Sequence, residues 1–164
     1  MTGRVLALLL WLLPMAAEAQ PVVYQPAGAG FRIEFPGPPE ATTRELGSVQ
    51  ALVASYEMQD MTFLAATANL PAVAATDPHR ALDAARNDAI GIEGRTLVVE
   101  RRLSVGGQPA RRLILDDPGR RQRVVVLLVI RGDRLYRLSV ATDPRPSLPV
   151  AGEKFLNSFA LIAN

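Results

Sequence analysis

A run of apolar, mostly β-branched residues at positions 124–130 (VVVLLVI) constrains the fold more than any other feature of the chain. Such an unbroken run is typical of a strand covered on both faces, because a strand with one solvated face alternates apolar and polar residues. Residues 134–142 do alternate, and Gly132 and Asp133 between the two segments suit a two-residue turn. The sequence therefore predicts a β-hairpin whose first arm lies at the centre of a sheet.

The rest of the chain is expected to form further strands beside this hairpin and helices that pack on the sheet. Alternating or β-rich segments joined by connectors with Gly, Ser, Pro and Asp predict strands at residues 31–35, 42–46, 49–58, 61–70, 96–105, 110–116, 122–131 and 134–142, with a short one at 161–162. Residues 70–76 are expected to form an irregular loop, and the connection at 47–48 a turn.

Two segments have the periodicity of amphipathic helices. Asp77 followed by Pro78 is a helix start, and that helix is expected to end near Gly91 or Gly94. Its core-facing stripe is Leu82, Ala85 and Ala89. A closing helix is expected after Ser147 as its cap, with an apolar stripe at Leu148, Ala151, Phe155 and Phe159.

This order of elements predicts an α+β fold, a mainly antiparallel meander covered by two or three helices. A parallel doubly wound fold would alternate strand and helix throughout. We expect a single domain at residues 31–164, preceded at 20–30 by a loose lead-in rich in Pro, Gly and Ala.

The first 19 residues predict a secretory signal peptide. Arg4 precedes a short apolar core, and Ala17-Glu18-Ala19 is a small-x-small cleavage site. The core is about half the ~20 residues of a spanning helix, so no membrane insertion is expected after cleavage. The expected location is therefore periplasmic or secreted, and the chain has no cysteine to form disulfides there.

The charge and the polar residues argue against several classes of site. A net charge of +2 and sparse aromatic residues do not suggest a nucleic-acid partner. His79 is the only histidine and reads as a surface residue, so we expect no metal site and no catalytic triad. Asp116 and Asp117 could act as an acid/base pair, but Asp117-Pro118 reads as a turn in which the carboxylate caps the backbone. No cofactor is predicted.

Four arginines are the candidate binding residues. If Gly106 and Gly107 form a two-residue turn, Arg101 faces Arg112 and Arg102 faces Arg111 across adjacent strands. Like charges in direct opposition are unfavourable, so these side chains must be balanced by acids such as Glu100 and Asp116, splay into solvent, or hold an anion. Long side chains that cover apolar surface with their heads in water are the alternative.

The chain also resembles a known family from about residue 30 to residue 162. The segment GAGFRIEFPGPP near the start, the GGQPA turn at 106–110, the GDRLY hairpin at 132–136 and KFLNSF at 154–159 are similar to small secreted bacterial proteins of the PsbP-like α/β sandwich, including the DcrB-like group. The resemblance implies a PsbP-like fold and a non-enzymatic envelope or accessory protein.

Three functions remain open at this point. The first is a non-catalytic periplasmic or secreted accessory or binding protein, whose partner is an envelope protein or a small anionic ligand. The second is a cofactor-free hydrolase or lyase that uses carboxylates and arginines on the sheet. The third is a structural component of an envelope complex.

Overall fold

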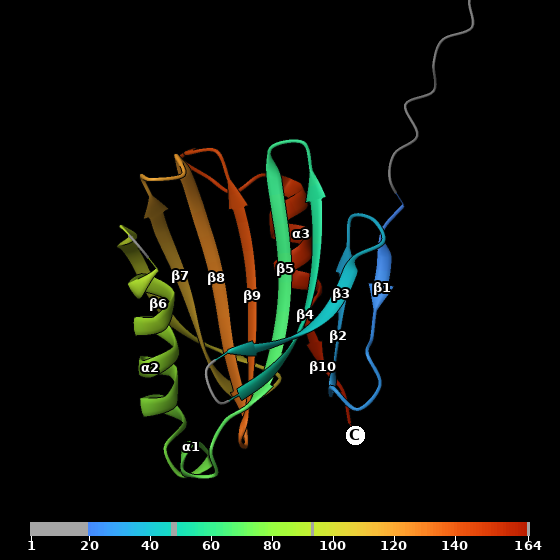
Figure 1. The fold of residues 1–164 in the computed structure, drawn as a ribbon, viewed down its shortest axis with the longest axis vertical. Coiled ribbons are helices and arrows are strands. Elements are labelled where there is room, and N and C mark those ends of the chain that lie inside the picture. The colour runs from blue at the N-terminus through green and yellow to red at the C-terminus, as the bar shows by residue number, and fades with distance from the viewer. Residues whose placement is uncertain (1–19, 47–48, 93, 164) are drawn as a thin grey trace, which may run out of the picture.

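The computed structural model describes residues 20–46, 49–92 and 94–163. Its main feature is a seven-stranded antiparallel sheet in the order β3-β4-β5-β9-β8-β7-β6 (Figure 1). The strands are β3 (Glu40–Leu46), β4 (Val49–Met58), β5 (Met61–Asn69), β6 (Thr96–Val105), β7 (Gln108–Asp117), β8 (Gln122–Arg131) and β9 (Arg134–Thr142). A smaller sheet holds β1 (Val22–Tyr24), β2 (Phe31–Phe35) and β10 (Ala160–Leu161) in the order β1-β2-β10.

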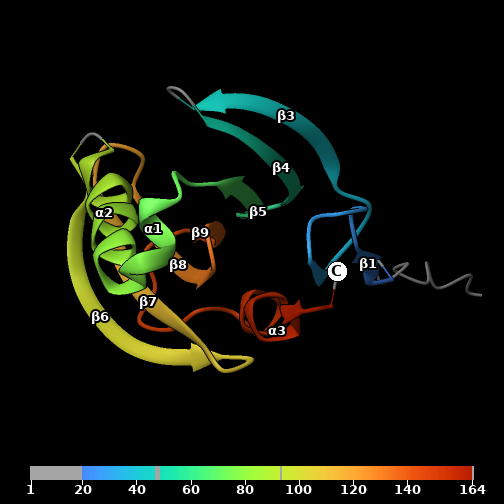
Figure 2. The same cartoon turned by 90° about the horizontal axis from the view of Figure 1, so that it is seen from below.

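Strand β8 lies inside the main sheet and is covered on both faces, as its sequence predicts. Every residue from 124 to 130 is buried. Helix α2 (Pro78–Gly91) covers one face and helix α3 (Val150–Ser158) the other, and Figure 2 shows the two helices on opposite sides of the sheet. We call these the α2 face and the α3 face.

The α3 face is packed with aromatic rings. Phe63 from β5, Phe155 from α3 and Phe35 from β2 are in contact, with ring centroids 5.3 Å and 4.9 Å apart along this chain of three. Strand β2, which belongs to the smaller sheet, therefore covers the α3-face core of the main sheet. Offset and edge-on ring pairs of this kind add stability beyond the area that they bury.

The α2 face is packed with aliphatic side chains. Leu82, Ala85 and Ala89 of α2 are buried against alternate residues of β7 and β8, such as Leu113 and Leu128. The helix begins as predicted, because the Asp77 carboxylate accepts a hydrogen bond from the Arg80 amide at 3.0 Å. Satisfying one of the free N–H groups of the first turn stabilises a helix start.

The structure corrects several local predictions. Residues 22–24 are paired in β1 where the sequence favoured a loose lead-in, because Val22 lies opposite Phe35 in the smaller sheet. Residues 70–76 contain a short helix, α1 (Val73–Thr76). Helix α3 begins after Pro149, so Ser147 is not its cap, and the final strand is one residue earlier than predicted. The predicted signal peptide at 1–19 and the turn at 47–48 lie outside the described residues.

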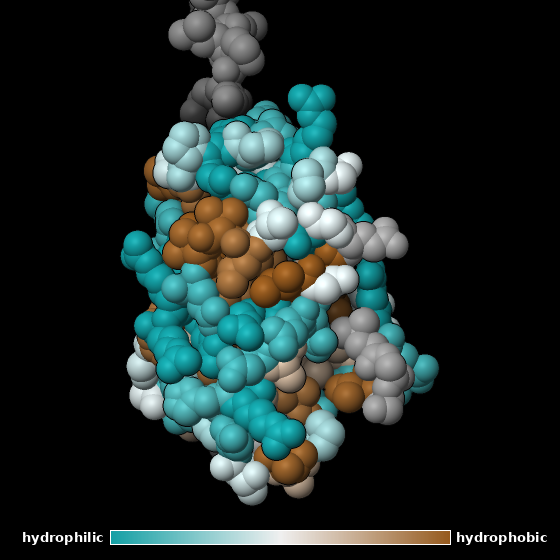
Figure 3. Space-filling model, turned by 90° about the vertical axis from the view of Figure 1, so that its left-hand side faces the viewer, coloured by the Kyte–Doolittle hydropathy of each residue, from teal (hydrophilic) through white to brown (hydrophobic). Residues whose placement is uncertain are grey.

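Strand β6 forms one edge of the main sheet and pairs only with β7. Most of its residues are exposed, and its register shifts between Leu97 and Val99. Figure 3 looks onto this side of the molecule, where apolar surface gathers in the upper half between polar areas. The exposed large apolar residues of β6 are Leu97, Val98 and Leu103, and Ile92 after α2 is exposed as well.

Candidate functional site

The register of β6 and β7 places the four candidate arginines as predicted. Arg101 lies opposite Arg112, and Arg102 lies opposite Arg111. Because side chains alternate between the faces of a strand, the first pair lies on the α3 face and the second pair on the α2 face. The two pairs have different surroundings.

Arg111 is buried in an ion cluster beneath α2. Only 1% of the residue is exposed, and its Nη1 lies 2.5 Å from Glu100 Oε1 and 2.6 Å from Asp83 Oδ1. Arg86 contacts the other oxygen of Glu100 at 3.2 Å. Burial alone would raise the pKa of Glu100, but hydrogen bonds and charge from Arg111 and Arg86 lower it below its ordinary value. The charge of Arg111 is thus neutralised by the protein, and Arg111 fastens α2 to the sheet, whereas Arg102 is exposed and makes no hydrogen bond or ion pair within the described residues.

The Arg101 and Arg112 pair is less compensated. Arg112 Nη2 lies 2.6 Å from Glu153 Oε1 of α3, whereas Arg101 is exposed and makes no hydrogen bond or ion pair within the described residues. Both arginines line a hollow of about 260 Å³ with Val99, Ile114 and Glu153. Two guanidinium groups and one carboxylate leave this hollow with an excess of positive charge.

The adjacent carboxylates at the end of β7 have structural partners. Asp117 Oδ1 accepts a hydrogen bond from the Arg120 amide at 3.2 Å, which confirms the turn. Its other oxygen pairs with Arg95 Nε at 3.0 Å, and this hydrogen bond lowers the pKa of Asp117 against the effect of burial. Asp116 pairs with Arg123 at 2.8 Å, which likewise lowers the pKa of Asp116. The sequence suggested Arg120 and Arg121 as the neutralising partners and did not identify Arg95 or Arg123.

His79 lies exposed in the first turn of α2. Its backbone carbonyl accepts a hydrogen bond from Arg111 Nη2 at 3.4 Å. No group of three or more His, Asp or Glu side chains within the described ranges is arranged to hold a metal ion.

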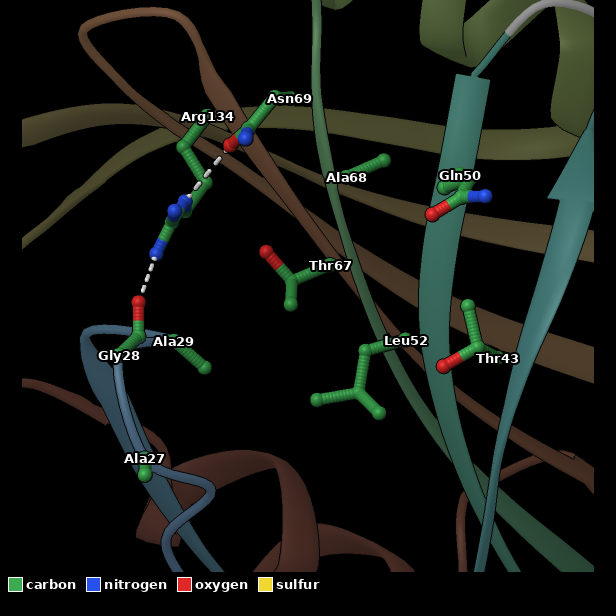
Figure 4. A pocket seen from close by; sticks show the side chains of 10 residues that line it. All are labelled: Ala27, Gly28, Ala29, Thr43, Gln50, Leu52, Thr67, Ala68, Asn69 and Arg134. Atoms are coloured by element: carbon green, nitrogen blue, oxygen red, sulfur yellow. Dashed lines mark hydrogen bonds between the residues drawn. The ribbon is translucent and has the colours of Figure 1, made fainter.

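A second hollow, of about 290 Å³, lies between the 27–29 loop and the ends of β4, β5 and β9. Figure 4 shows Arg134 reaching from Asn69 to the carbonyl of Gly28, with distances of 3.0 Å and 2.6 Å. Thr67 Oγ1 is buried here without a hydrogen-bond partner among the described residues. The hydrogen bonds of Arg134 connect the 27–29 loop to β5 and β9. We therefore interpret this hollow as a structural feature and not as a binding site.

The architecture is PsbP-like: a seven-stranded antiparallel sheet with a small second sheet and helices on both faces. The solution structure of cyanobacterial PsbP (CyanoP) from Synechocystis sp. PCC 6803 matches with a TM-score of 0.60, over 91% of this chain and 96% of that chain, at 14% sequence identity. This likeness confirms the fold expected from the resemblance in sequence, and at that identity it shows the fold alone.

No family model and no curated protein matches the chain. No helix in the described parts of the chain is long and apolar enough to cross a membrane.

Proposed function

We propose that this protein is a non-catalytic accessory or binding protein of the periplasm or extracellular space, which binds an anionic group of its partner at the Arg101 and Arg112 hollow. One observation carries the proposal: Arg101 and Arg112 lie opposite each other on a rigid strand pair, with Glu153 as the single carboxylate beside them. One carboxylate does not neutralise two guanidinium groups. Planar guanidinium donors match the oxygens of carboxylate and phosphate groups.

The ionisation of three carboxylates on β6 and β7 supports a binding role over a hydrolase or lyase. The pKa values of Glu100, Asp116 and Asp117 all lie below their ordinary values, and arginine hydrogen bonds contribute to each shift. A general acid or base works best with a pKa near the operating pH. Carboxylates held ionised by arginines are suited to structural pairing.

The test is anion-dependent thermal stability of the purified protein. Sulfate should raise the melting temperature with saturation, beyond the effect of NaCl at the same ionic strength, because a ligand of the native state stabilises it by mass action. Arg101→Gln should abolish that increment. Arg102→Gln is the matched control, since Arg102 is also exposed at the neighbouring position but points to the other face.

Two results would count against the proposal. One is a sulfate increment of equal size in the wild type and in Arg101→Gln. The other is an increment that disappears in Arg102→Gln and persists in Arg101→Gln, which would move the site to the α2 face.

A further inference from the structure

One arginine on the α2 face, Arg137, has no hydrogen-bond or ion-pair partner among the residues that the structure describes. Arg137 lies in the middle of β9, opposite Leu128 of β8 on one side and Ala66 of β5 on the other. It makes no hydrogen bond or ion pair with any residue in the described ranges. The buried arginine side chains nearby do have partners: Arg111 has two carboxylates within 2.6 Å, and Arg95 lies 3.0 Å from Asp117. Arg137 is therefore the exception on its face.

The electrostatic surroundings of Arg137 are unfavourable for its charge. Burial lowers the pKa of the Arg137 guanidinium, and the nearby charge of Arg95 lowers it further. Asp88 on α2 opposes these effects but lies beyond ion-pair distance. A buried cation that lacks a hydrogen-bonded anion costs folding free energy, so an anion supplied from outside would gain much of its affinity by removing that cost.

A groove gives access to this guanidinium from solvent. It has a volume of about 490 Å³, which is within the ~300–1,000 Å³ typical of small-ligand pockets. Arg137 and Asp88 are its charged residues and Thr67 is its uncharged polar residue, whereas the rest of the lining is apolar and includes Val49, Ala51, Ala66 and Ala68 of β4 and β5. The groove lies beside α2, which packs mainly on β7 and β8 (Figure 2).

We propose that this groove binds a monoanionic amphiphile of the fatty-acid class, whose carboxylate pairs with Arg137 and whose alkyl chain lies on the small apolar side chains of β4 and β5. One unpaired guanidinium calls for one anionic head, and its planar N–H groups fit a carboxylate in a bidentate pair. The scarcity of polar groups in the lining favours an alkyl chain over a peptide, because buried peptide groups need hydrogen-bond partners.

The site is independent of the proposed function. Arg137 lies on the α2 face, whereas Arg101 and Arg112 line a hollow on the α3 face. A negative sulfate titration at Arg101 would not count against the proposed groove site. A negative amphiphile titration would likewise not count against the proposed sulfate site.

The experiment is a calorimetric and thermal-shift titration with octanoate, below the concentration at which it forms micelles. Acetate carries the same head without the chain, and octanol the chain without the charge. We expect a saturable rise in melting temperature with octanoate, and at least a tenfold weaker response to either control compound. Comparable responses to octanol and octanoate would overturn the proposal, because the charge would then not be recognised. Absence of saturable octanoate binding would overturn it as well.

Variants locate the binding in the protein. Arg137→Leu should lose the octanoate response at least tenfold, and it should fold, because it replaces an unpaired buried cation by an apolar side chain. Ala68→Leu keeps the cation but narrows the groove, and should also weaken octanoate binding. Arg32→Gln is the matched control, since Arg32 is exposed on β2 in the smaller sheet, and should bind as the wild type does. Equal binding by the wild type and Arg137→Leu would refute the site.

Discussion

The face of the main sheet under α3 is packed with aromatic rings, whereas the face under α2 is packed with aliphatic side chains around buried and partly buried arginines. All five phenylalanines and all three tyrosines of the chain belong to the α3 side. Arg111 and Arg137 belong to the α2 side. The comparison separates two tasks: the α3 side supplies most of the close packing, and the α2 side carries polar groups that cost stability unless they are paired.

The largest effect is expected on the aromatic side. Phe63→Ala removes a fully buried ring that contacts Phe155 and Tyr56, and it should lower the free energy of unfolding by about 3–5 kcal/mol. Chemical denaturation gives the measurement. A loss below about 1 kcal/mol would show that the aromatic side does not dominate the stability of the fold.

A somewhat smaller effect is expected from the central strand on the α2 side. Leu128 is fully buried, and Leu128→Ala should cost about 2–4 kcal/mol, because the deletion leaves a cavity under α2. Denaturant melts of this variant beside Phe63→Ala compare the two faces directly. A loss below about 0.5 kcal/mol would mean that β8 is not central to the core.

Arg111→Met should destabilise the protein by about 2 kcal/mol. The substitution leaves Asp83 and Glu100 without their main cation, but both carboxylates are partly exposed and Arg86 still contacts Glu100, so the cost is below that of a fully buried pair. The control is Arg102→Gln on the facing strand, which should change stability by less than about 0.5 kcal/mol. Equal effects of the two substitutions would mean that Arg111 does not fasten α2.

The smallest effect is a pH dependence of the same cluster. The pKa of Glu100 is lowered in the folded protein, so its pairing contributes stability above the unfolded pKa of about 4.3 and loses it as the pH falls further. The melting temperature of the wild type should therefore fall more steeply below about pH 4.3 than that of Arg111→Met. Parallel curves for the two proteins would show that Glu100 is not linked to folding through Arg111.

Local sequence patterns predicted the strands, the turn chemistry and the pairing of the arginines well. The run at 124–130 identified the central strand, and Gly106 with Gly107 gave the register of β6 and β7. The PsbP-like fold followed from the order of elements together with the resemblance. These features depend on residues that are close together in the sequence, so local sequence patterns are enough to predict them.

Contacts between distant segments could not be predicted in the same way. Arg137 occupies an outward position of an alternating strand, where an arginine normally reaches solvent. Alternation does not reveal that a helix from an earlier segment packs on that face, nor that Asp83 of this helix pairs with Arg111 while Arg137 has no ion pair among the described residues. Likewise, the pairing of β1 depends on β2 folding back beside it.

The exposed edge formed by β6 also bears on how the protein avoids aggregation. The N–H and C=O groups of this ten-residue strand that point away from β7 would invite a second chain to extend the sheet. The register shift between Leu97 and Val99 disturbs the regular spacing of the free N–H and C=O groups, and the charges of Glu100, Arg101 and Arg102 follow directly. Edge strands with an irregularity and charged side chains are poor templates for further strands. The outer edge of β6 can therefore remain unpaired, with its apolar residues exposed to solvent, without recruiting a second chain.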